Sequence, residues 1–124
     1  MRNFHLLLIT CALLVIFAAP ARAEWRKLGT YRVTAYCPCA RCCGKSDGIT
    51  ADGTYAPGCL GLIVAAPKGI LFGTLLQIEG VGVATVHDRG GAISGSRLEL
   101  FFATHKEALQ WGVQERKVSM WVEP

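Results

Sequence analysis

Short stretches of alternating or continuous apolar residues recur along this chain, and they predict strands. The segment TYRVTAY (30–36) alternates, with Tyr31, Val33 and Ala35 on one face, which indicates a strand buried on one side. The segment GLIVAAP (61–67) is a short apolar run between a glycine and a proline and is typical of a fully buried strand. Four further segments have strand-like patterns: TLLQIEG (74–80), VGVATVHD (81–88), SRLELFF (96–102) and RKVSMWV (116–122).

One segment, THKEALQWG (104–112), has the pattern of a helix. It opens with Thr104, has Glu107 three residues later as in a capping box, and stops at Gly112, a residue suited to the left-handed end of a helix. Six short strands with one short helix predict a mainly β protein. We expect a small closed barrel, because closure leaves no strand edge exposed.

The N-terminus has the pattern of a secretory signal peptide. Arg2 supplies a positive charge, residues 6–19 are apolar, and ARA at 21–23 has small residues at the positions that signal peptidase recognises. The apolar run is shorter than the roughly 20 residues of a membrane-spanning helix. We therefore expect cleavage after Ala23, a secreted or periplasmic protein with no stable membrane anchor, and one domain at 24–124. An uncleaved anchor is the alternative.

The charge of the chain argues against one class of partner. Without Arg2 and Arg22, which precede the predicted cleavage site, 11 of the 13 Lys and Arg residues remain against 9 acidic residues, and no run of basic residues occurs. Nucleic-acid-binding domains concentrate Lys and Arg on one face, so we expect no nucleic-acid partner. The same charge leaves an anionic cell-wall polymer open as a ligand.

Five cysteines of the predicted domain are candidates for crosslinking. The segment CPCARCC places Cys37, Cys39, Cys42 and Cys43 within seven residues, and Cys59 follows further on. In a small exported domain the usual stabilising device is the disulfide, which contributes ~2–4 kcal/mol each. We therefore predict at least one disulfide among these five residues, with one thiol left over.

A structural zinc site is the second interpretation of the same cysteines, and free thiols are the third. Thiolates are good zinc ligands, although zinc sites usually draw them from two separate segments, and four of these cysteines come from one short loop. A c-type haem is excluded because no histidine follows the C-x-x-C of residues 39–42. A dithiol oxidoreductase is disfavoured because no βαβ pattern surrounds that motif. We expect the cluster to stiffen a loop, and we predict no cofactor and no catalytic metal.

Two acidic residues occupy strand positions from which they could act together. Asp88 ends an apolar run and is followed by Arg89 and two glycines, and Glu99 follows eleven residues after Asp88. If the two carboxylates lie close together, their repulsion raises the affinity of one of them for a proton, which suits general acid catalysis near neutral pH. The alternative is that Asp88 only marks a turn and that Glu99 only forms an ion pair with Arg97 or Arg89.

The other polar candidates have simpler explanations. Asp52, in GITADG (48–53), precedes a glycine and is typical of a turn. His87 is expected to face the side of its strand opposite to Asp88 and to have no catalytic role. His105 falls at the first position of the predicted helix, and we expect it on the surface.

Four segments of this sequence together resemble the 3D domain family. They are TAYCPCARCCGKSDGITADGT, GTLLQIEGVG, HDRGGAISGSRLELFF and THKEALQWG, and the resemblance extends over residues 30–122. The family is named for three aspartates and shares its core with the C-terminal part of membrane-bound lytic transglycosylase A. The resemblance implies a six-stranded double-psi β-barrel, which agrees with the strands and the helix predicted above.

The resemblance also implies cleavage of the glycan strands of peptidoglycan between MurNAc and GlcNAc. We expect the protein to act as a monomer, without metal or cofactor. One carboxylic acid protonates the glycosidic oxygen and then, as a carboxylate, takes the proton of the C6 hydroxyl that attacks the anomeric carbon. The family motif assigns this acid to Asp88, with Glu99 as a neighbouring carboxylate that tunes it. Four residues would bind or admit the substrate: Thr50, Asp52, Gly90 and Gly91.

The sequence departs from the family at two of the three aspartates. Ala66 stands where the first is expected, 22 residues before Asp88, and Glu99 replaces the third. A barrel that binds peptidoglycan without cleaving it, or that has only a structural role, is therefore the second functional hypothesis. A metal or redox protein built on the cysteine loop is the third.

Overall fold

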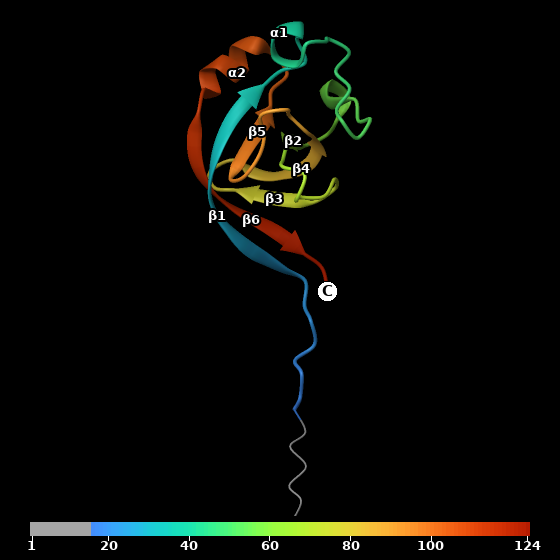
Figure 1. Ribbon diagram of the computed structural model, residues 1–124, viewed down its shortest axis with the longest axis vertical. Helices are drawn as coiled ribbons and strands as arrows, with labels where there is room; N and C mark the ends of the chain where they lie inside the picture. Colours follow the sequence, from blue (N-terminus) through green and yellow to red (C-terminus); the bar gives the residue numbers. More distant parts are fainter. Residues whose placement is uncertain (1–15) are drawn as a thin grey trace, which may run out of the picture.

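The computed structural model describes residues 16–124, which form one closed barrel of six strands (Figure 1). The strands are β1 (Glu24–Tyr36), β2 (Leu62–Ala65), β3 (Leu75–Ile78), β4 (Gly82–Asp88), β5 (Arg97–Phe101) and β6 (Gln114–Val122). The helices are α1 (Ala40–Cys43) and α2 (His105–Trp111), and a short 3₁₀ helix covers Ala56–Gly58. No helix within the described range is long and apolar enough to cross a membrane.

The predicted signal peptide falls mainly outside this description. Residues 1–15 lie outside the described residues, and residues 16–23 form neither helix nor strand. Strand β1 begins at Glu24, the residue after the predicted cleavage site. Signal cleavage and a domain boundary at residue 24 stay predictions.

Strands that are distant in sequence are neighbours in the barrel, whose order is β1-β5-β2-β4-β3-β6. Two pairs are parallel, β1 with β5 and β2 with β4, and the other four are antiparallel. Parallel neighbours cannot be joined by a hairpin, and other strands lie between them in the sequence: β3 between β2 and β4, and β2, β3 and β4 between β1 and β5. This closed barrel confirms the mainly β fold predicted from the sequence, and it is consistent with a double-psi β-barrel.

Strand β1 is longer than its alternating segment predicted. It starts six residues earlier and pairs with β6 from Glu24 opposite Val122 to Val33 opposite Gln114, with a register shift between Lys27 and Gly29. The residues 24–29 have no clear alternation, and they become a strand because β6 offers them a continuous partner. The pairing with β6 ends at Val33, and the last residues of β1 continue beyond it.

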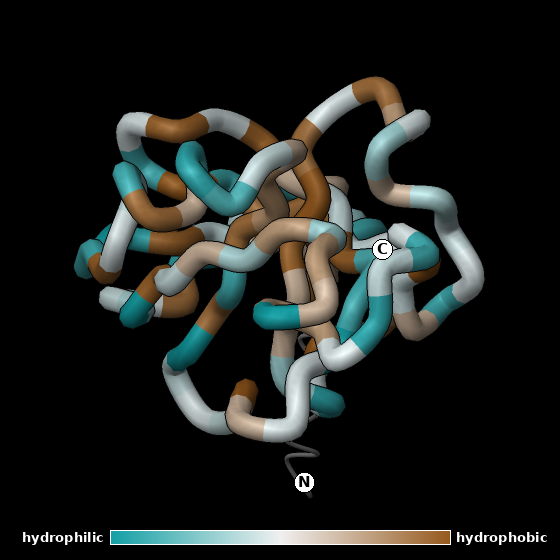
Figure 2. Tube along the Cα trace, turned by 90° about the horizontal axis from the view of Figure 1, so that it is seen from above, coloured by the Kyte–Doolittle hydropathy of each residue, from teal (hydrophilic) through white to brown (hydrophobic). Residues whose placement is uncertain are grey.

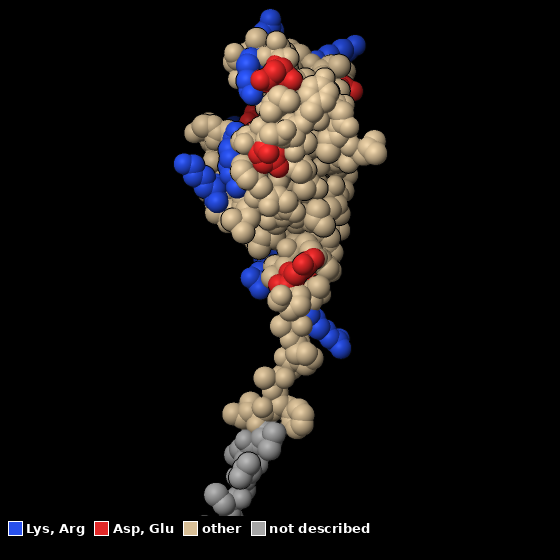
Figure 3. Space-filling view, turned by 90° about the vertical axis from the view of Figure 1, so that its right-hand side faces the viewer, with Lys and Arg blue, Asp and Glu red and all other residues tan. Residues whose placement is uncertain are grey.

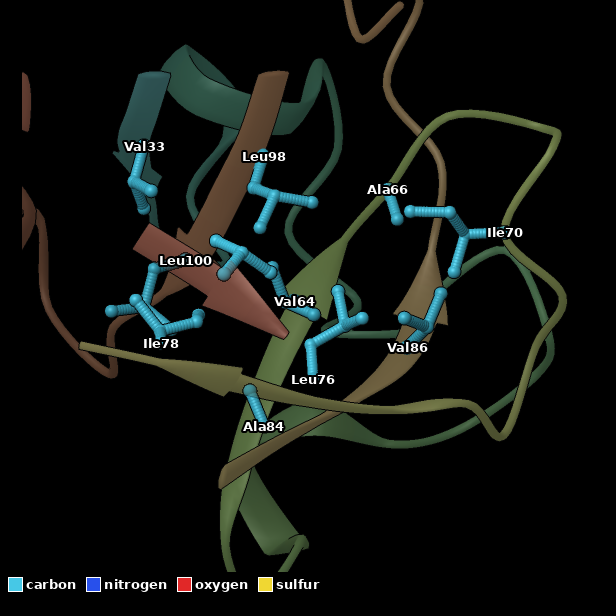
Figure 4. Close-up of a cluster of buried hydrophobic side chains, with 11 residues drawn as sticks. Val33, Val64, Ala66, Ile70, Leu76, Ile78, Ala84, Val86, Leu98 and Leu100 are labelled. Carbon is cyan, nitrogen blue, oxygen red and sulfur yellow. The ribbon is translucent and has the colours of Figure 1, made fainter. Parts of the chain in front are cut away.

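The core fills the inside of the barrel with alternating strand residues (Figure 4). Every strand contributes to it, as expected of a small barrel whose inward positions are filled by side chains. The buried cluster consists of Val33, Val64, Ala66, Ile70, Leu76, Ile78, Ala84, Val86, Leu98, Leu100 and Val118. Hydrophobic segments accordingly run through the centre of the view from above (Figure 2).

Helix α2 confirms the helical segment predicted from the sequence, including its capping box. Thr104 Oγ1 accepts a hydrogen bond from Glu107 N (3.2 Å), and Glu107 Oε2 accepts one from Thr104 N (3.1 Å). The other end of the helix is held to β1, because Trp111 Nε1 donates to the Val33 carbonyl (3.0 Å). With α2 docked in this way, its start lies beside α1, the short helix that follows β1 (Figure 1).

Candidate functional site

A cavity of ≈ 340 Å³ lies where β1, β4 and β5 end. These strand ends are at the top of the barrel in Figure 1. The walls of the cavity are these strand ends, the loop that contains α1, and the loop that precedes the 3₁₀ helix. The lining residues are Tyr36, Pro38, Cys42, Cys43, Lys45, Asp47, Gly48, Ile49, Thr50, Ala51, Ala56, Ala65, Asp88, Arg89, Gly90, Gly91, Glu99 and Phe101. On the face shown in Figure 3, basic and acidic residues are interspersed, without a broad patch of one sign.

Most of the site residues predicted from the sequence line this cavity. Asp88, Glu99, Thr50, Gly90 and Gly91 all do, and they come from three separate segments of the chain. Of the predicted disulfide cysteines, two line it: Cys42 and Cys43. Asp52 does not line it.

The register of the barrel brings the two acidic residues together. Ala65, at the end of β2, pairs with Asp88 on one side and with Glu99 on the other. A register shift between Val64 and Ala65 sets Val64 opposite Val86 but Ala65 opposite Asp88, so that His87 is skipped. The two carboxylates therefore extend from the two strands that flank Ala65.

Asp88 is held firmly by three hydrogen-bond donors. Its Oδ2 accepts from Tyr36 Oη (2.8 Å), and its Oδ1 accepts from the backbone N–H groups of Ala51 (2.9 Å) and Arg89 (2.8 Å). A carboxylate is a pure acceptor, so these donors use both of its oxygens. Burial raises the pKa of Tyr36, and the hydrogen bond to Asp88 raises it further, so this phenol stays a donor at physiological pH.

Glu99 has a different environment. Burial raises the pKa of its carboxyl group, the neighbouring charge of Asp88 raises it further, and Arg97 acts in the opposite direction. No residue in the 16–124 range forms a hydrogen bond or an ion pair with the Glu99 carboxylate. Arg89 is turned away, because its guanidinium donates to the carbonyls of Ala66 (3.3 Å) and Ile70 (2.5 Å). The alternative of a Glu99–Arg89 ion pair is therefore wrong for this structure.

The two glycines after Asp88 have different surroundings. A Cβ on Gly90 would lie 2.7 Å from Ile93 Cγ1 and 3.3 Å from Glu99 Oε2, whereas a Cβ on Gly91 would have no atom within 4 Å. Gly90 therefore makes room for the Glu99 side chain, a role that its sequence position alone did not indicate. Gly91 leaves open space at the cavity wall.

Asp52 acts on the loop rather than on the cavity. Its Oδ2 lies 2.6 Å from His87 Nδ1, and its Oδ1 accepts from Thr50 Oγ1 (2.7 Å) and Thr54 N (3.1 Å). Burial opposes ionisation of Asp52, but these hydrogen bonds outweigh it and hold the pKa of its carboxyl group well below the usual range. The network fixes the loop that presents Ala51 N to Asp88, so Asp52 supports the site indirectly.

Two contributors to the site escaped sequence analysis. Tyr36 is the last residue of the predicted strand 30–36, but nothing local assigns it to the site, and only the barrel brings its hydroxyl to Asp88, 52 residues away. Ala51 contributes a backbone N–H group, for which a side chain gives no signal. His105 was expected on the surface, but it is half-buried and lies beside Cys37, Cys39 and Cys42. The five cysteines from Cys37 to Cys59 are free thiols in the structure, and the disulfide stays a prediction.

The fold and the site together define a small, closed β-barrel with paired carboxylates at the mouth of a cavity. Residues 63–123 match the 3D domain family, and the chain therefore carries a 3D domain, as its motifs indicated. The match includes strands β3 to β6, all of β2 except its first residue, and both acidic residues.

Two curated relatives come from Bacillus subtilis. Cell wall-binding protein YocH is 36% identical over 80 residues, which cover 62% of this chain and 28% of the relative. Putative cell wall shaping protein YabE is 34% identical over 96 residues, which cover 76% of this chain and 23% of the relative. The chain thus spans about a quarter of the length of the curated relatives it matches.

Proposed function

We propose that this chain is an exported lytic transglycosylase that cleaves peptidoglycan between MurNAc and GlcNAc. The observation that carries the proposal is the pairing of Asp88 and Glu99 across Ala65 at the wall of an open cavity. The 3D domain and two relatives named for cell wall binding and cell wall shaping support a cell-wall substrate. A glycan strand would lie in the cavity, against Thr50 and Gly91.

The environments of the two carboxylates favour Glu99 as the proton donor. A general acid must carry a proton near the working pH and must be free to give it to the substrate. The pKa of Glu99 is raised by burial and by Asp88, and its carboxyl group has no competing partner among the described residues. Asp88 already accepts three hydrogen bonds. This assignment exchanges the roles that the family motif implied. Glu99 is the acid, and Asp88 is the neighbouring carboxylate, held in place by its hydrogen bonds.

The reaction then needs one acid and no water. Glu99 gives its proton to the glycosidic oxygen, the bond from that oxygen to the anomeric carbon of MurNAc breaks, and GlcNAc leaves with a 4-hydroxyl group. The resulting Glu99 carboxylate takes the proton of the MurNAc C6 hydroxyl as O6 bonds to the anomeric carbon. The product is 1,6-anhydro-MurNAc, and Glu99 regains its proton. The charge of Asp88 stabilises the positive charge that develops on the sugar ring.

The test is digestion of purified peptidoglycan by the wild type, Glu99→Gln and Asp88→Asn, with the products identified by mass. Wild type should release fragments that lack one water relative to hydrolysis products. General acid–base catalysis contributes ~10²–10⁴-fold, so Glu99→Gln should lose activity by that factor. Glu115→Gln is the matched control, because Glu115 is exposed and lies outside the cavity. Full activity of Glu99→Gln would overturn the assignment of the acid.

A binding module without catalysis is the second candidate, and the alanine at position 66 favours it. Ala66 stands where the family motif has its first aspartate, so the site lacks that acidic group. In this case the wild type would sediment with peptidoglycan but release no fragments. Binding lost in Asp88→Asn and kept in Glu115→Gln would then place the binding surface at the same cavity.

A further inference from the structure

Four potential metal ligands converge beside the cavity, outside the pair of carboxylates. They are the sulfur atoms of Cys37, Cys39 and Cys42 and a ring nitrogen of His105, and these atoms all lie within 4.8 Å of one another. Cys37 directly follows β1, Cys39 is the N-cap of α1, and Cys42 lies within α1. His105 is the first residue of α2.

The distances within this cluster fit a tetrahedral site. His105 Nδ1 lies 3.6 Å from Cys37 Sγ, 3.6 Å from Cys39 Sγ and 3.5 Å from Cys42 Sγ. Zinc–sulfur bonds of about 2.3 Å and zinc–nitrogen bonds of about 2.0–2.1 Å place tetrahedral S···N edges at about 3.5–3.6 Å and S···S edges at about 3.8 Å. Cys37 Sγ lies 3.0 Å from Cys39 Sγ and 3.4 Å from Cys42 Sγ. These two sulfur–sulfur distances would lengthen by less than about 1 Å when a metal ion is bound.

The ligands come from two separate segments, as is usual for structural zinc. The sequence argument against zinc was that the cysteines belong to one loop, and His105 from a helix more than sixty residues away removes it. Both segments are fixed by backbone hydrogen bonds. Cys42 N and Cys43 N donate to the Cys39 carbonyl (3.1 and 3.0 Å), and the capping box orients the first turn of α2.

We propose that Cys37, Cys39, Cys42 and His105 bind one Zn²⁺ ion, with three thiolates and the imidazole Nδ1 as ligands. Four protein ligands leave no open position for water, so the site is structural. Binding through Nδ1 puts the ring proton on Nε2, so the 3.5 Å approach of Arg41 Nη1 to Nε2 is not a hydrogen bond in the metal-bound state. The positive Arg41 instead offsets the net negative charge of three thiolates around one divalent ion.

The other two cysteines of the predicted domain provide internal controls. Cys43 directs its sulfur to the Cys37 carbonyl (3.2 Å), and Cys59 lies at the end of the 3₁₀ helix, with its sulfur near its neighbour Leu60. Neither belongs to the four-residue cluster. Cys42 lines the cavity, so zinc would hold one wall of the proposed substrate site in place. The zinc proposal does not depend on the proposed activity.

The test is the metal content of the protein purified from exporting cells without chelator. We expect about one zinc per chain, and on exchange with Co²⁺ we expect thiolate charge-transfer bands and the d–d spectrum of a tetrahedral site. His105→Ala should weaken zinc binding by more than about 10-fold, whereas Cys43→Ser and Cys59→Ser should keep the zinc. Since His105→Ala could also disturb folding, His105→Cys is the informative second variant. It should keep the metal and strengthen the charge-transfer bands.

Two results would overturn the proposal. One is a purified wild type without metal in which non-reducing mass spectrometry shows a disulfide among Cys37, Cys39 and Cys42. The other is a Cys43→Ser or Cys59→Ser variant that folds but loses zinc, because the ligand set would then be wrong.

Discussion

The hydroxyl group of Tyr36, at the end of β1, donates a 2.8 Å hydrogen bond to the carboxylate of Asp88, at the end of β4. Strands β5 and β2 lie between these two strands in the barrel, so the bond reaches across the mouth of the barrel. Tyr36 is buried and its ring packs edge-on against Phe101, with centroids 5.5 Å apart. Because the Tyr36 ring is held by this packing, its hydrogen bond fixes the position of the Asp88 carboxylate.

The first prediction is that Tyr36→Phe destabilises the protein while preserving its fold. The ring stays in place, but Asp88 loses one of three donors, and hydrogen bonds to charged groups contribute about 1.5–3 kcal/mol. The free energy of unfolding in urea at pH 7 should fall by about that amount. Tyr55→Phe serves as the control, because Tyr55 is exposed. Equal stability of the two variants would show that the bond to Asp88 contributes nothing.

The second prediction concerns the pH dependence caused by Glu99. The folded-state pKa of Glu99 is raised, so the folded protein holds this proton more tightly than the unfolded chain does. The resulting stability is fully present below the unfolded pKa of about 4.3 and is lost as the pH rises through the folded pKa. Glutamine does not ionise, so the Glu99→Gln variant does not lose this stability as the pH rises. The free energy of unfolding of Glu99→Gln relative to wild type should therefore rise from about pH 4 upward and then level off.

Denaturant unfolding at several pH values between acid and neutral measures this difference. Glu115→Gln removes an exposed carboxylate in the same manner and serves as the control. A difference for Glu99→Gln that stays flat, or that falls as the pH rises, would contradict the raised pKa.

The third prediction separates the two glycines that follow Asp88. Gly90→Ala brings a methyl group to 2.7 Å from Ile93 Cγ1 and 3.3 Å from Glu99 Oε2, whereas Gly91→Ala meets no atom within 4 Å. Because Gly90→Ala must displace Ile93 or the proposed acid, we expect it to lower peptidoglycan cleavage by about 10-fold or more. Gly91→Ala should lose less activity than Gly90→Ala, because its methyl group meets no atom of the protein. If activity is lost equally in both, substrate contact at the loop rather than the position of Glu99 is the cause.

The local sequence was sufficient to predict the elements whose signals lie within their own residues. The capping residues Thr104 and Glu107 define the start of α2 within its own first turn, and the helix begins where they predict. The apolar runs contain β2, β3, β4 and β5. The first six residues of β1 were missed because their pairing partner, β6, lies at the other end of the chain.

The site shows the same division more clearly. The sequence determined that Asp88 ends a strand beside glycines and that a second acid follows at a fixed spacing, because strand ends and turns are local properties. Only the tertiary structure decided that Ala65 holds the two acids side by side, that Tyr36 and Ala51 occupy the oxygens of Asp88, and that His105 joins the cysteines. Those contacts depend on the order and register of strands in a closed barrel. Register is set by how all six strands pack around one core, which no single stretch of sequence encodes.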